Sequence, residues 1–443
     1  MIKKGSLTGL LLFGMFFGAG NLIFPPQLGL ESGQNFWPAI GGFVLSGVGI
    51  AILTLIIGTL NPKGYIDEIS KKIAPWFAVV YLVALYLAIG PFFAIPRTAT
   101  TAFSVGIEPM LPAGSHAIWL FGFTLVYFAF AYLIALTPSK ILDSIGRYLT
   151  PIFALLIVVL VVLGAAKYGS TDPQGATAEY AASAFGAGFL QGYNTLDALA
   201  SVAFSVVAVT TLNQLGFKNK KEYISTIWVV GILVALGFSV LYIGLAFLGN
   251  HFPLNLANLP KGANVGASVL SSATQAIFGP MAQIFLAIMV TVTCFTTTAG
   301  LIVSTGEFFH NTFSKVSYKV YATIFTLVGF AIANLGLNAI IQYSVPALEI
   351  LYPITIAIVM IVMVNRFLPL SKPGMQLTIA VVTLIAFASI LGRQFQLTAI
   401  LNLVNALPFA QASLPWLLPA LVGILLSLLL PNKQKSEAFE FEA

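Results

Sequence analysis

Stretches of about 20 apolar residues recur along almost the whole chain, and they constrain its fold more than any other feature, because a helix of that length spans the hydrocarbon core of a bilayer. The chain has 443 residues, of which 58% are hydrophobic and 8% are charged, whereas a soluble domain usually carries about 25% charged residues. We therefore predict an all-α polytopic membrane protein. The composition excludes a soluble enzyme, a disordered chain and a nucleic-acid binder.

The apolar stretches predict twelve membrane-spanning helices. We place them near residues 7–31, 36–60, 76–104, 118–137, 148–166, 184–212, 223–249, 279–309, 320–335, 339–364, 375–392 and 413–430. The ninth is short for a span. The outer connection near 250–278 ends in an apolar stretch that we expect to form a surface helix.

The Lys and Arg residues indicate the orientation, because the cytoplasmic loops of membrane proteins are enriched in them. With the N-terminus inside, sixteen of the 20 fall in cytoplasmic segments. Lys167, Lys261 and Arg393 fall outside, and Arg97 lies within the third span. This alternation supports twelve spans. It predicts a protein of the plasma or inner membrane with both termini in the cytoplasm.

Several kinds of chemistry have no motif in this chain. No Gly-Lys dipeptide occurs, so the phosphate-binding loop of an ATP-driven pump is missing. The sequence contains neither a Gly-x-Ser-x-Gly motif nor a His-Glu-x-x-His motif. Cys294 is the single cysteine, so no intrachain disulfide can form. We expect neither enzymatic activity nor an organic cofactor.

The first and sixth predicted spans are both interrupted. Residues 14–26 contain three glycines, Asn21 and two prolines, and residues 186–197 contain three glycines, Asn194 and Asp197. Such segments break a helix. Backbone without helical hydrogen bonds is stable at membrane depth only where it is buried within the protein or lines a cavity. Interrupted helices at corresponding positions indicate the binding site of a transporter built from inverted repeats. We therefore predict repeats 1–183 and 184–364, followed by two helices and a tail in 365–443.

The broken ends predict what is bound. Free N–H groups at the start of a half-helix suit a carboxylate, and free carbonyls at its end suit Na⁺ or an ammonium group. A zwitterionic amino acid presents both charges. The expected substrate contacts are Gly18, Ala19, Gly20, Asn21, Gly192, Tyr193 and Asn194. The alternative is that Gly14/Gly18 and Gly188/Gly192, as Gly-x-x-x-Gly pairs, only allow close helix packing.

A few polar side chains within spans are candidates for ion binding or coupling. Asp197 either caps the second half of span six, in a capping box with Asn194, or contributes to ion binding. Glu349 in span ten is a candidate proton carrier, and Arg97 suits an outer-gate or interfacial role better than substrate contact. In span eight, Thr296 and Thr297 offer hard oxygen donors that suit Na⁺.

Four segments resemble a known family. Residues 17–26, 89–98, 192–199 and 351–353 are similar to motifs of the bacterial branched-chain amino acid carriers, the BrnQ-type (LIVCS) family. The resemblance implies the inverted-repeat leucine-transporter fold and import of leucine, isoleucine and valine with a cation, usually Na⁺. It also implies that Asn21 binds one ion beside the substrate carboxylate. The carbonyls of Gly14 and Phe17 would bind a second ion together with Thr296 and Thr297.

The sequence therefore predicts a symporter that works by alternating access, with Na⁺ as the coupling ion. A proton-coupled carrier of the same fold would need a titrating acid such as Asp197 or Glu349. A channel and an amino-acid sensor are the alternatives of other classes. A channel predicts a continuous polar stripe, which the spans lack, and a sensor is expected to carry an added soluble domain.

Overall fold

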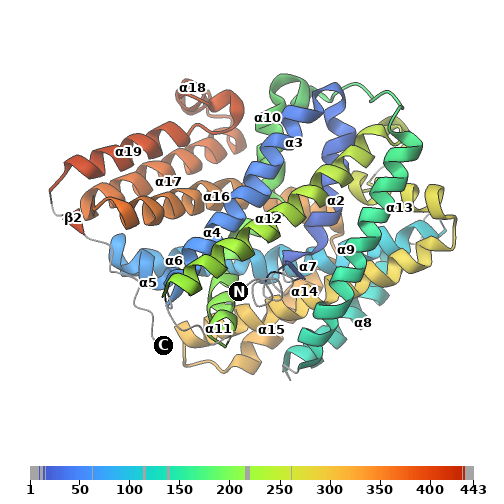
Figure 1. The fold of residues 1–443 in the computed structure, drawn as a ribbon, viewed down its shortest axis with the longest axis horizontal. Coiled ribbons are helices and arrows are strands. Elements are labelled where there is room, and N and C mark those ends of the chain that lie inside the picture. The colour runs from blue at the N-terminus through green and yellow to red at the C-terminus, as the bar shows by residue number, and fades with distance from the viewer. Residues whose placement is uncertain are drawn as a thin grey trace.

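The computed structural model is helical almost throughout (Figure 1). It describes residues 9, 13–14, 16–61, 63–112, 116–136, 140–214, 220–260, 262–431 and 433–434. The first half comprises α2 (Ala19–Ser32), η1 (Gly33–Asn35), α3 (Phe36–Val44), η2 (Leu45–Ile50), α4 (Ala51–Thr59), α5 (Gly64–Lys72), α6 (Pro75–Leu87), η3 (Ala88–Phe92), α7 (Ala94–Ala102), η4 (Phe103–Ile107), η5 (Glu108–Met110), α8 (His116–Leu136) and α9 (Lys140–Tyr168).

The second half continues in the same style, with one short pair of strands. It comprises α10 (Ala178–Tyr193), α11 (Asp197–Gln214), α12 (Lys220–His251), η6 (Leu256–Asn258), α13 (Val265–Phe278), α14 (Ala282–Thr312), α15 (Tyr318–Ala333), α16 (Leu337–Phe367), β1 (Leu370–Ser371), α17 (Lys372–Gln394), α18 (Thr398–Asn405), η7 (Ala410–Ala412), α19 (Leu417–Leu429) and β2 (Lys433–Gln434). Strands β1 and β2 pair antiparallel.

Helix occupies each of the twelve predicted spans within the described part of the chain. Seven helices there are long and apolar enough to cross a membrane. The ninth span is the short α15, with 16 residues. The all-helical membrane architecture is thus confirmed, while the count of twelve spans stays a prediction. The apolar stretch before span eight forms α13, which packs on α2.

Both predicted helix breaks are present. Backbone at Gly18 is extended (φ −136°, ψ −164°) and α2 begins at the next residue. The second break separates the end of α10 at Tyr193 from the start of α11 at Asp197. Leu196 lies between them in the left-handed region, with φ 66°, where a branched side chain is rare. The tertiary structure holds this strained turn.

A third break, which the sequence analysis did not predict, divides span three. Helix α6 passes into the π-helical η3, where Gly90 has non-helical backbone (φ −91°, ψ −122°), before α7 begins at Ala94. Pro91 supplies no N–H and clashes with the preceding turn. A Cβ at Gly90 would lie 2.9 Å from the Thr305 side chain, so the break also lets span three approach α14 closely.

The packing partners of the two halves match when each span is exchanged for the one five places later. Span one packs on span seven (α2 on α12), and span six packs on span two (α10 on α3). Similarly, α9 packs on α12 and α16 packs on α4. The same exchange maps the α7–α14 pair onto itself. Two inverted five-helix repeats produce this pattern, with α17 and α19 side by side next to them (Figure 1). The repeat boundaries near 183 and 364 stay predictions.

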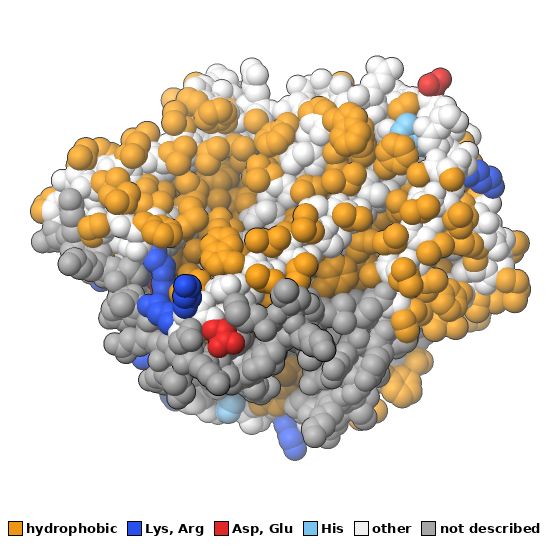
Figure 2. Space-filling model, in the orientation of Figure 1, with side chains coloured by type: hydrophobic (Ala, Val, Ile, Leu, Met, Phe, Trp, Pro, Cys, Tyr) orange, Lys and Arg blue, Asp and Glu red, His pale blue; other side chains and the backbone are white. Residues whose placement is uncertain are grey.

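The surface of the molecule is largely apolar. Hydrophobic side chains are spread over the described part of the face in Figure 2, with few charged side chains among them. Trp76, Leu236 and Leu384 are each more than half exposed. A soluble monomer rarely leaves so much contiguous apolar surface in water, so this surface is suited to lipid.

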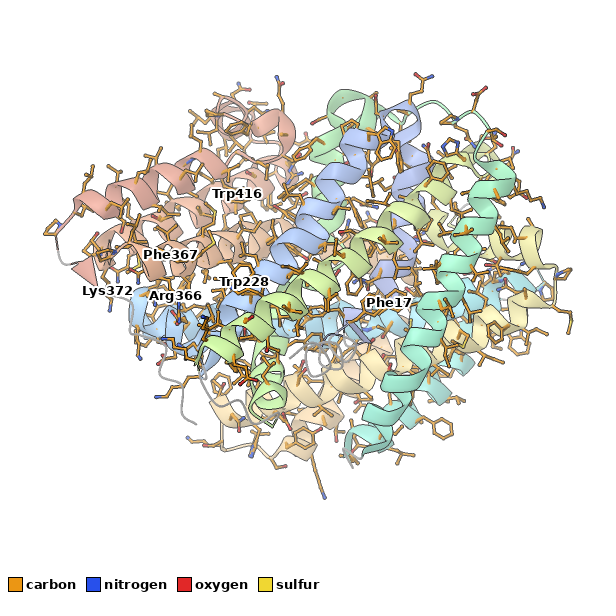
Figure 3. All side chains as sticks on the ribbon, in the orientation of Figure 1. Phe17, Trp228, Arg366, Phe367, Lys372 and Trp416 are labelled. Carbon is orange, nitrogen blue, oxygen red and sulfur yellow. The ribbon has the colours of Figure 1, made fainter. Side chains whose placement is uncertain are left out.

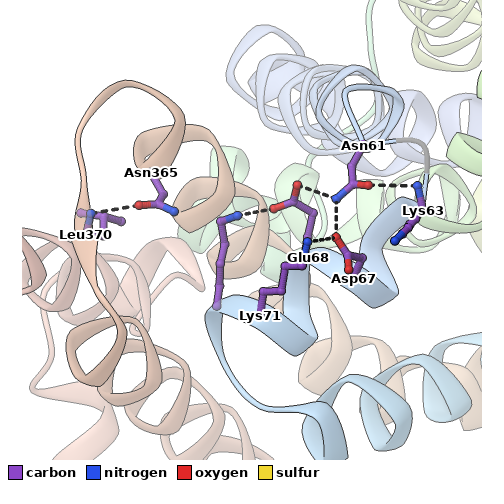
Figure 4. A network of polar contacts seen from close by, with 8 residues as sticks. Asn61, Lys63, Asp67, Glu68, Lys71, Asn365 and Leu370 are labelled. Carbon is purple, nitrogen blue, oxygen red and sulfur yellow. Dashed lines mark hydrogen bonds and ion pairs between the residues drawn. The ribbon is translucent and has the colours of Figure 1, made fainter. Parts of the chain in front are cut away.

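A polar network orders the connection between α4 and α6 (Figure 4). Asn61 donates from Nδ2 to Asp67 Oδ2 at 3.1 Å and to Glu68 Oε1 at 2.9 Å. Lys72 pairs with Glu68, and Lys71 pairs with Asp67 at 3.0 Å. Burial alone would raise the pKa of Asp67, but hydrogen bonds from Asn61 and Lys71 lower it below the usual value.

The two lysines of this network provide a matched test of stability. Lys72 and Glu68 are buried, with side chains 8% and 9% exposed, whereas Lys71 is 46% exposed. Removing one partner of a buried pair costs roughly 3–5 kcal/mol, and an exposed pair contributes about 0–1 kcal/mol. We expect Lys72→Ala to lower the melting temperature of the purified protein well below that of Lys71→Ala. Equal melting temperatures would contradict a structural role for the buried pair.

Candidate functional site

The three helix breaks meet around one cavity. Its empty volume is about 410 Å³, counting the part that opens to solvent. The cavity is lined by Phe16, Gly18, Ala19, Gly20, Asn21, Ile89, Ala94, Arg97, Thr98, Thr195, Leu196, Asp197, Ala200, Phe204, Thr297 and Leu301. It therefore joins span one, span three, span six and α14. Figure 3 shows Phe17, at the break before α2, within the helical bundle.

Asn21 ties the first break to the second. Its side-chain oxygen accepts a hydrogen bond from the Gly18 N–H at 2.8 Å, which closes the first turn of α2. Its Nδ2 donates to both carboxylate oxygens of Asp197, at 3.3 and 3.1 Å, and to the Tyr242 hydroxyl. An amide oxygen has two lone pairs, so the Asn21 oxygen keeps one acceptor position beside the cavity.

Asp197 is held by side chains rather than by a capping box with Asn194. The Tyr242 hydroxyl, from α12, donates to its Oδ2 at 2.6 Å. At the start of α11, Thr195 supplies the oxygen that accepts from the Asp197 N–H, at 3.4 Å. The Asn194 side chain instead donates to Gln191 at 3.0 Å. The carboxylate therefore lines the cavity and accepts hydrogen bonds from Asn21 and Tyr242, and its role in ion binding stays a prediction.

Arg97 lies in the same cavity and is 3% exposed. Its guanidinium donates to the carbonyl of Asn194, and to that of Thr195 at 3.2 Å. It also lies over the Phe24 ring, 5.3 Å from the centroid. A fixed positive charge thus occupies the carbonyl end of α10, where a helix favours a cation. This burial argues against an interfacial position, and the outer-gate role stays a prediction.

Helix α14 contributes Thr297 but not Thr296 to the cavity lining. The Thr297 side chain lies 3.5 Å from the position that a Cβ on Gly18 would take, so it faces the first break. The hydroxyls of both threonines donate to the Thr293 carbonyl, at 2.9 Å for Thr296 and 3.2 Å for Thr297. Thr298 bonds to Thr98 and Tyr127 and thereby joins α14 to α7 and α8.

The other predicted ion ligands and the sixth-span glycines have different surroundings. Phe17 is fully buried and its N–H bonds to the Phe13 carbonyl at 2.9 Å. Gly14 has helical backbone in the preceding half-helix. A Cβ on Gly188 would lie 1.9 Å from the Ala39 oxygen, and one on Gly192 would lie 1.9 Å from Ser46 Oγ. These two glycines therefore let α10 pack on span two, and neither lines the cavity.

Tyr193 and Glu349 face a second cavity. Tyr193 stacks on Tyr352, with ring centroids 4.1 Å apart. Glu349 forms an ion pair with Arg393. The central cavity thus brings together Gly18, Ala19, Gly20, Asn21, Asp197 and Thr297. The Asn194 carbonyl contacts Arg97, which lines that cavity. Tyr193 and Glu349 line the second cavity instead.

Sequence reasoning did not assign Thr98, Thr195 and Tyr242 to the site, and it did not place Arg97 in the lining of the cavity. For Arg97 a signal was available, because a charged residue within a span is costly and usually functional. Its place beside the Ile89-Gly90-Pro91 segment was a second signal. The other three are ordinary polar residues of membrane helices, and only the tertiary contacts distinguish them.

Known proteins are similar to this chain along its whole length. A model of the family described as "Branched-chain amino acid transport protein" matches residues 1–434. A protein of Staphylococcus haemolyticus, named as a branched-chain amino acid carrier, is 39% identical over 433 residues, which are 96% of each chain. One of Staphylococcus aureus (strain USA300), named in the same way, is 38% identical over 449 residues and all of both chains.

Two solved structures share the fold at low sequence identity. MhsT in complex with L-phenylalanine has a TM-score of 0.58 at 17% identity, covering 95% of this chain and 97% of that one. The inward-facing conformation of Mhp1 has a TM-score of 0.56 at 14% identity, covering 96% and 89%. Both are transporters of the leucine-transporter fold. The chain described here belongs to the branched-chain amino acid transport protein family and is a multi-pass membrane transporter of that fold.

Proposed function

We propose that this protein is a secondary active symporter that imports leucine, isoleucine and valine across the bacterial cell membrane together with Na⁺. The observation that carries the proposal is the meeting of the broken ends of α2 and of α10 and α11 at one cavity. Alternating access would expose this cavity to each side in turn. Na⁺ bound beside the substrate raises its affinity, and the effect is reciprocal.

The cavity has groups that suit both the carboxylate and the side chain of an aliphatic amino acid. The first-turn amides of α2, at Ala19 and Gly20, are placed for the carboxylate. The aliphatic side chain would contact Ile89, Phe204 and Leu301, which line the same space. Gly192 and Tyr193 would then act from outside the cavity, by setting how closely α10 packs on its neighbours.

The Na⁺ ligands that we propose are oxygens at the first break and on α14. Asn21 offers the second lone pair of its amide oxygen, and Gly14 and Phe17 offer carbonyls. Thr297 faces Gly18, so it is better placed than Thr296 to complete a second ion site. Neutral hydroxyl and carbonyl oxygens suit a hard monovalent cation.

Proton coupling is the second candidate, and Asp197 is the observation that favours it. This carboxylate is 6% exposed and accepts hydrogen bonds from Asn21 and Tyr242 within the cavity. Protonation would convert an acceptor into a donor and rearrange that network. Glu349 is a weaker proton carrier, since its ion pair with Arg393 favours the charged form.

The Asp197→Asn variant tests how the carboxylate is used. We expect isoleucine uptake to fall at least tenfold, because the amide loses the charge that faces Arg97 and turns a donor toward Asn21. Uptake into proteoliposomes containing equal amounts of protein measures the effect. Asp172→Asn makes the same change in a loop outside the cavity and should leave uptake unchanged. Normal uptake by Asp197→Asn would restrict Asp197 to a structural role.

The coupling ion is tested by radiolabelled isoleucine uptake into proteoliposomes under an imposed Na⁺ gradient and, separately, under an imposed pH gradient. Accumulation that requires Na⁺ supports the proposal. Accumulation driven only by the pH gradient would replace Na⁺ by H⁺ and transfer coupling to Asp197. Failure to take up isoleucine, leucine or valine under both gradients would refute the substrate assignment.

A further inference from the structure

We propose that a second pocket, formed by α10, α16, α17 and the segment from α18 to Trp416, binds a zwitterionic apolar amino acid. This inference rests on the proposed function and extends it from one binding site to two. The pocket has an empty volume of about 670 Å³, counting the part that opens to solvent. It is thus larger than the central cavity, whose corresponding volume is about 410 Å³. The two cavities share no lining residue.

The pocket contains both charges that recognise an amino-acid backbone. Glu349 on α16 pairs with Arg393 on α17, and the Arg393 Nη1 donates to Glu349 Oε1 at 3.2 Å. The Glu349 side chain is 13% exposed and that of Arg393 is 54% exposed. The carboxylate is therefore held inside the pocket, and the guanidinium reaches its rim.

The remaining walls are mostly apolar and well ordered by packing. Tyr193, Val404 and Trp416 are each less than a tenth exposed, and they line the pocket together with Leu190 and Leu401. Figure 3 shows Trp416 at the start of α19, beside the other C-terminal helices. An aliphatic or aromatic side chain would therefore contact apolar side chains next to the two charges.

The ion pair can exchange partners with such a ligand at small cost. A partly exposed pair contributes only a little to stability, because water screens it. A bound zwitterion replaces the lost ion pair with two interactions: its carboxylate accepts from Arg393, and its ammonium donates to Glu349. An amine or a carboxylic acid alone would leave one of the two charges without its partner. The arrangement therefore selects ligands that carry both charges.

The pocket and the central cavity are connected through one short segment of the chain, because Tyr193 lines the pocket and Thr195 lines the cavity. Tyr193 lines the pocket and stacks on Tyr352, with ring centroids 4.1 Å apart. The two residues that follow Tyr193 in the chain present their carbonyls to Arg97 of the central cavity. A ligand that displaces Tyr193 would therefore move the two carbonyls at the end of α10 to which Arg97 donates. The pocket is placed to hold substrate next to the central site.

Equilibrium binding of radiolabelled isoleucine to the purified full-length protein in detergent tests the proposal. We expect two molecules bound per chain in the unaltered protein and one in Glu349→Gln and in Arg393→Gln. Glu108→Gln is the matched control, because Glu108 pairs with His116 at 2.9 Å outside both cavities; it should bind two. Leu401→Trp fills the pocket without changing a charge and should bind one.

The outcomes separate this inference from the proposed function. One molecule per chain in the unaltered protein, unaffected by Glu349→Gln and Leu401→Trp, would overturn the second pocket and leave the transporter assignment intact. No bound isoleucine at all would overturn both. Asn21→Ala should remove the central molecule and leave the one in the second pocket. Loss of both molecules in an Asn21→Ala protein that elutes as a single folded species would also contradict independent sites.

Discussion

Asn21→Ala is expected to lower isoleucine uptake about 100-fold while the protein stays at normal abundance in the membrane. Asn21 accepts from the Gly18 N–H and donates to Asp197 and Tyr242. Loss of a helix cap costs roughly 1 kcal/mol, and loss of a hydrogen bond to a charged group costs roughly 1.5–3 kcal/mol. These losses sum to roughly 2.5–4 kcal/mol. Since about 1.4 kcal/mol corresponds to a tenfold change in affinity, a cost of this size borne by the substrate-bound state predicts a decrease of about 100-fold or more.

The control for Asn21→Ala lies a few turns further along the chain. Asn35 donates to the Tyr180 carbonyl at 3.1 Å and lines neither cavity, so Asn35→Ala should keep nearly full uptake. The initial rate of uptake is measured against external Na⁺ concentration for both variants. An unchanged dependence on Na⁺ in Asn21→Ala would contradict the proposal that Asn21 binds the ion.

Gly29→Val is expected to prevent accumulation of folded protein. A Cβ at Gly29 would lie 1.8 Å from the Ala246 carbonyl oxygen, which belongs to the backbone of α12. Overpacking costs typically 1–3 kcal/mol where side chains can adjust, but here the backbone of one helix must move away from the other. Helices α2 and α12 form one of the main contacts of the fold, so the whole bundle is affected.

Gly41→Val provides the comparison for this stability test. Gly41 is also a helical glycine of the first repeat, but a Cβ there would meet nothing within 4 Å. Fluorescence-detected size-exclusion chromatography of tagged protein measures how much folded material each variant gives. We expect a near-normal peak for Gly41→Val and none for Gly29→Val. A normal peak for Gly29→Val would show that α2 and α12 are not packed as closely as described.

The helix breaks show which structural features the local sequence can predict. Glycines beside Asn21 and beside Asn194 predicted the two discontinuous helices, because glycine and polar residues weaken a helix wherever they occur in it. Gly90 and Pro91 weaken span three in the same local way, and the third break lies there. For Gly188 and Gly192 local pattern could not separate packing from binding, because the answer depends on Ala39 and Ser46 of another helix.

The candidate site was predicted only in part for the same reason. Sequence placed Asn21 and Asp197 at breaks, but their mutual hydrogen bond joins residues 176 positions apart. Thr297 rather than Thr296 faces the first break because of the rotation of α14, which apolar periodicity does not fix on a helix that is apolar on most sides. Glu349 lies beside Arg393 and not beside Asp197, because α16 packs on α17.

The sequence by itself determined that this chain is a bundle of membrane helices with two broken spans, because hydrophobic length and helix-breaking residues act locally. The tertiary structure alone decided which side chains share a cavity. It brought Arg97 to the carbonyl end of α10, joined Asn21, Asp197 and Tyr242, and opened a second pocket around Glu349 and Arg393. These contacts join helices far apart in the chain, so the relative position and rotation of whole helices determine them.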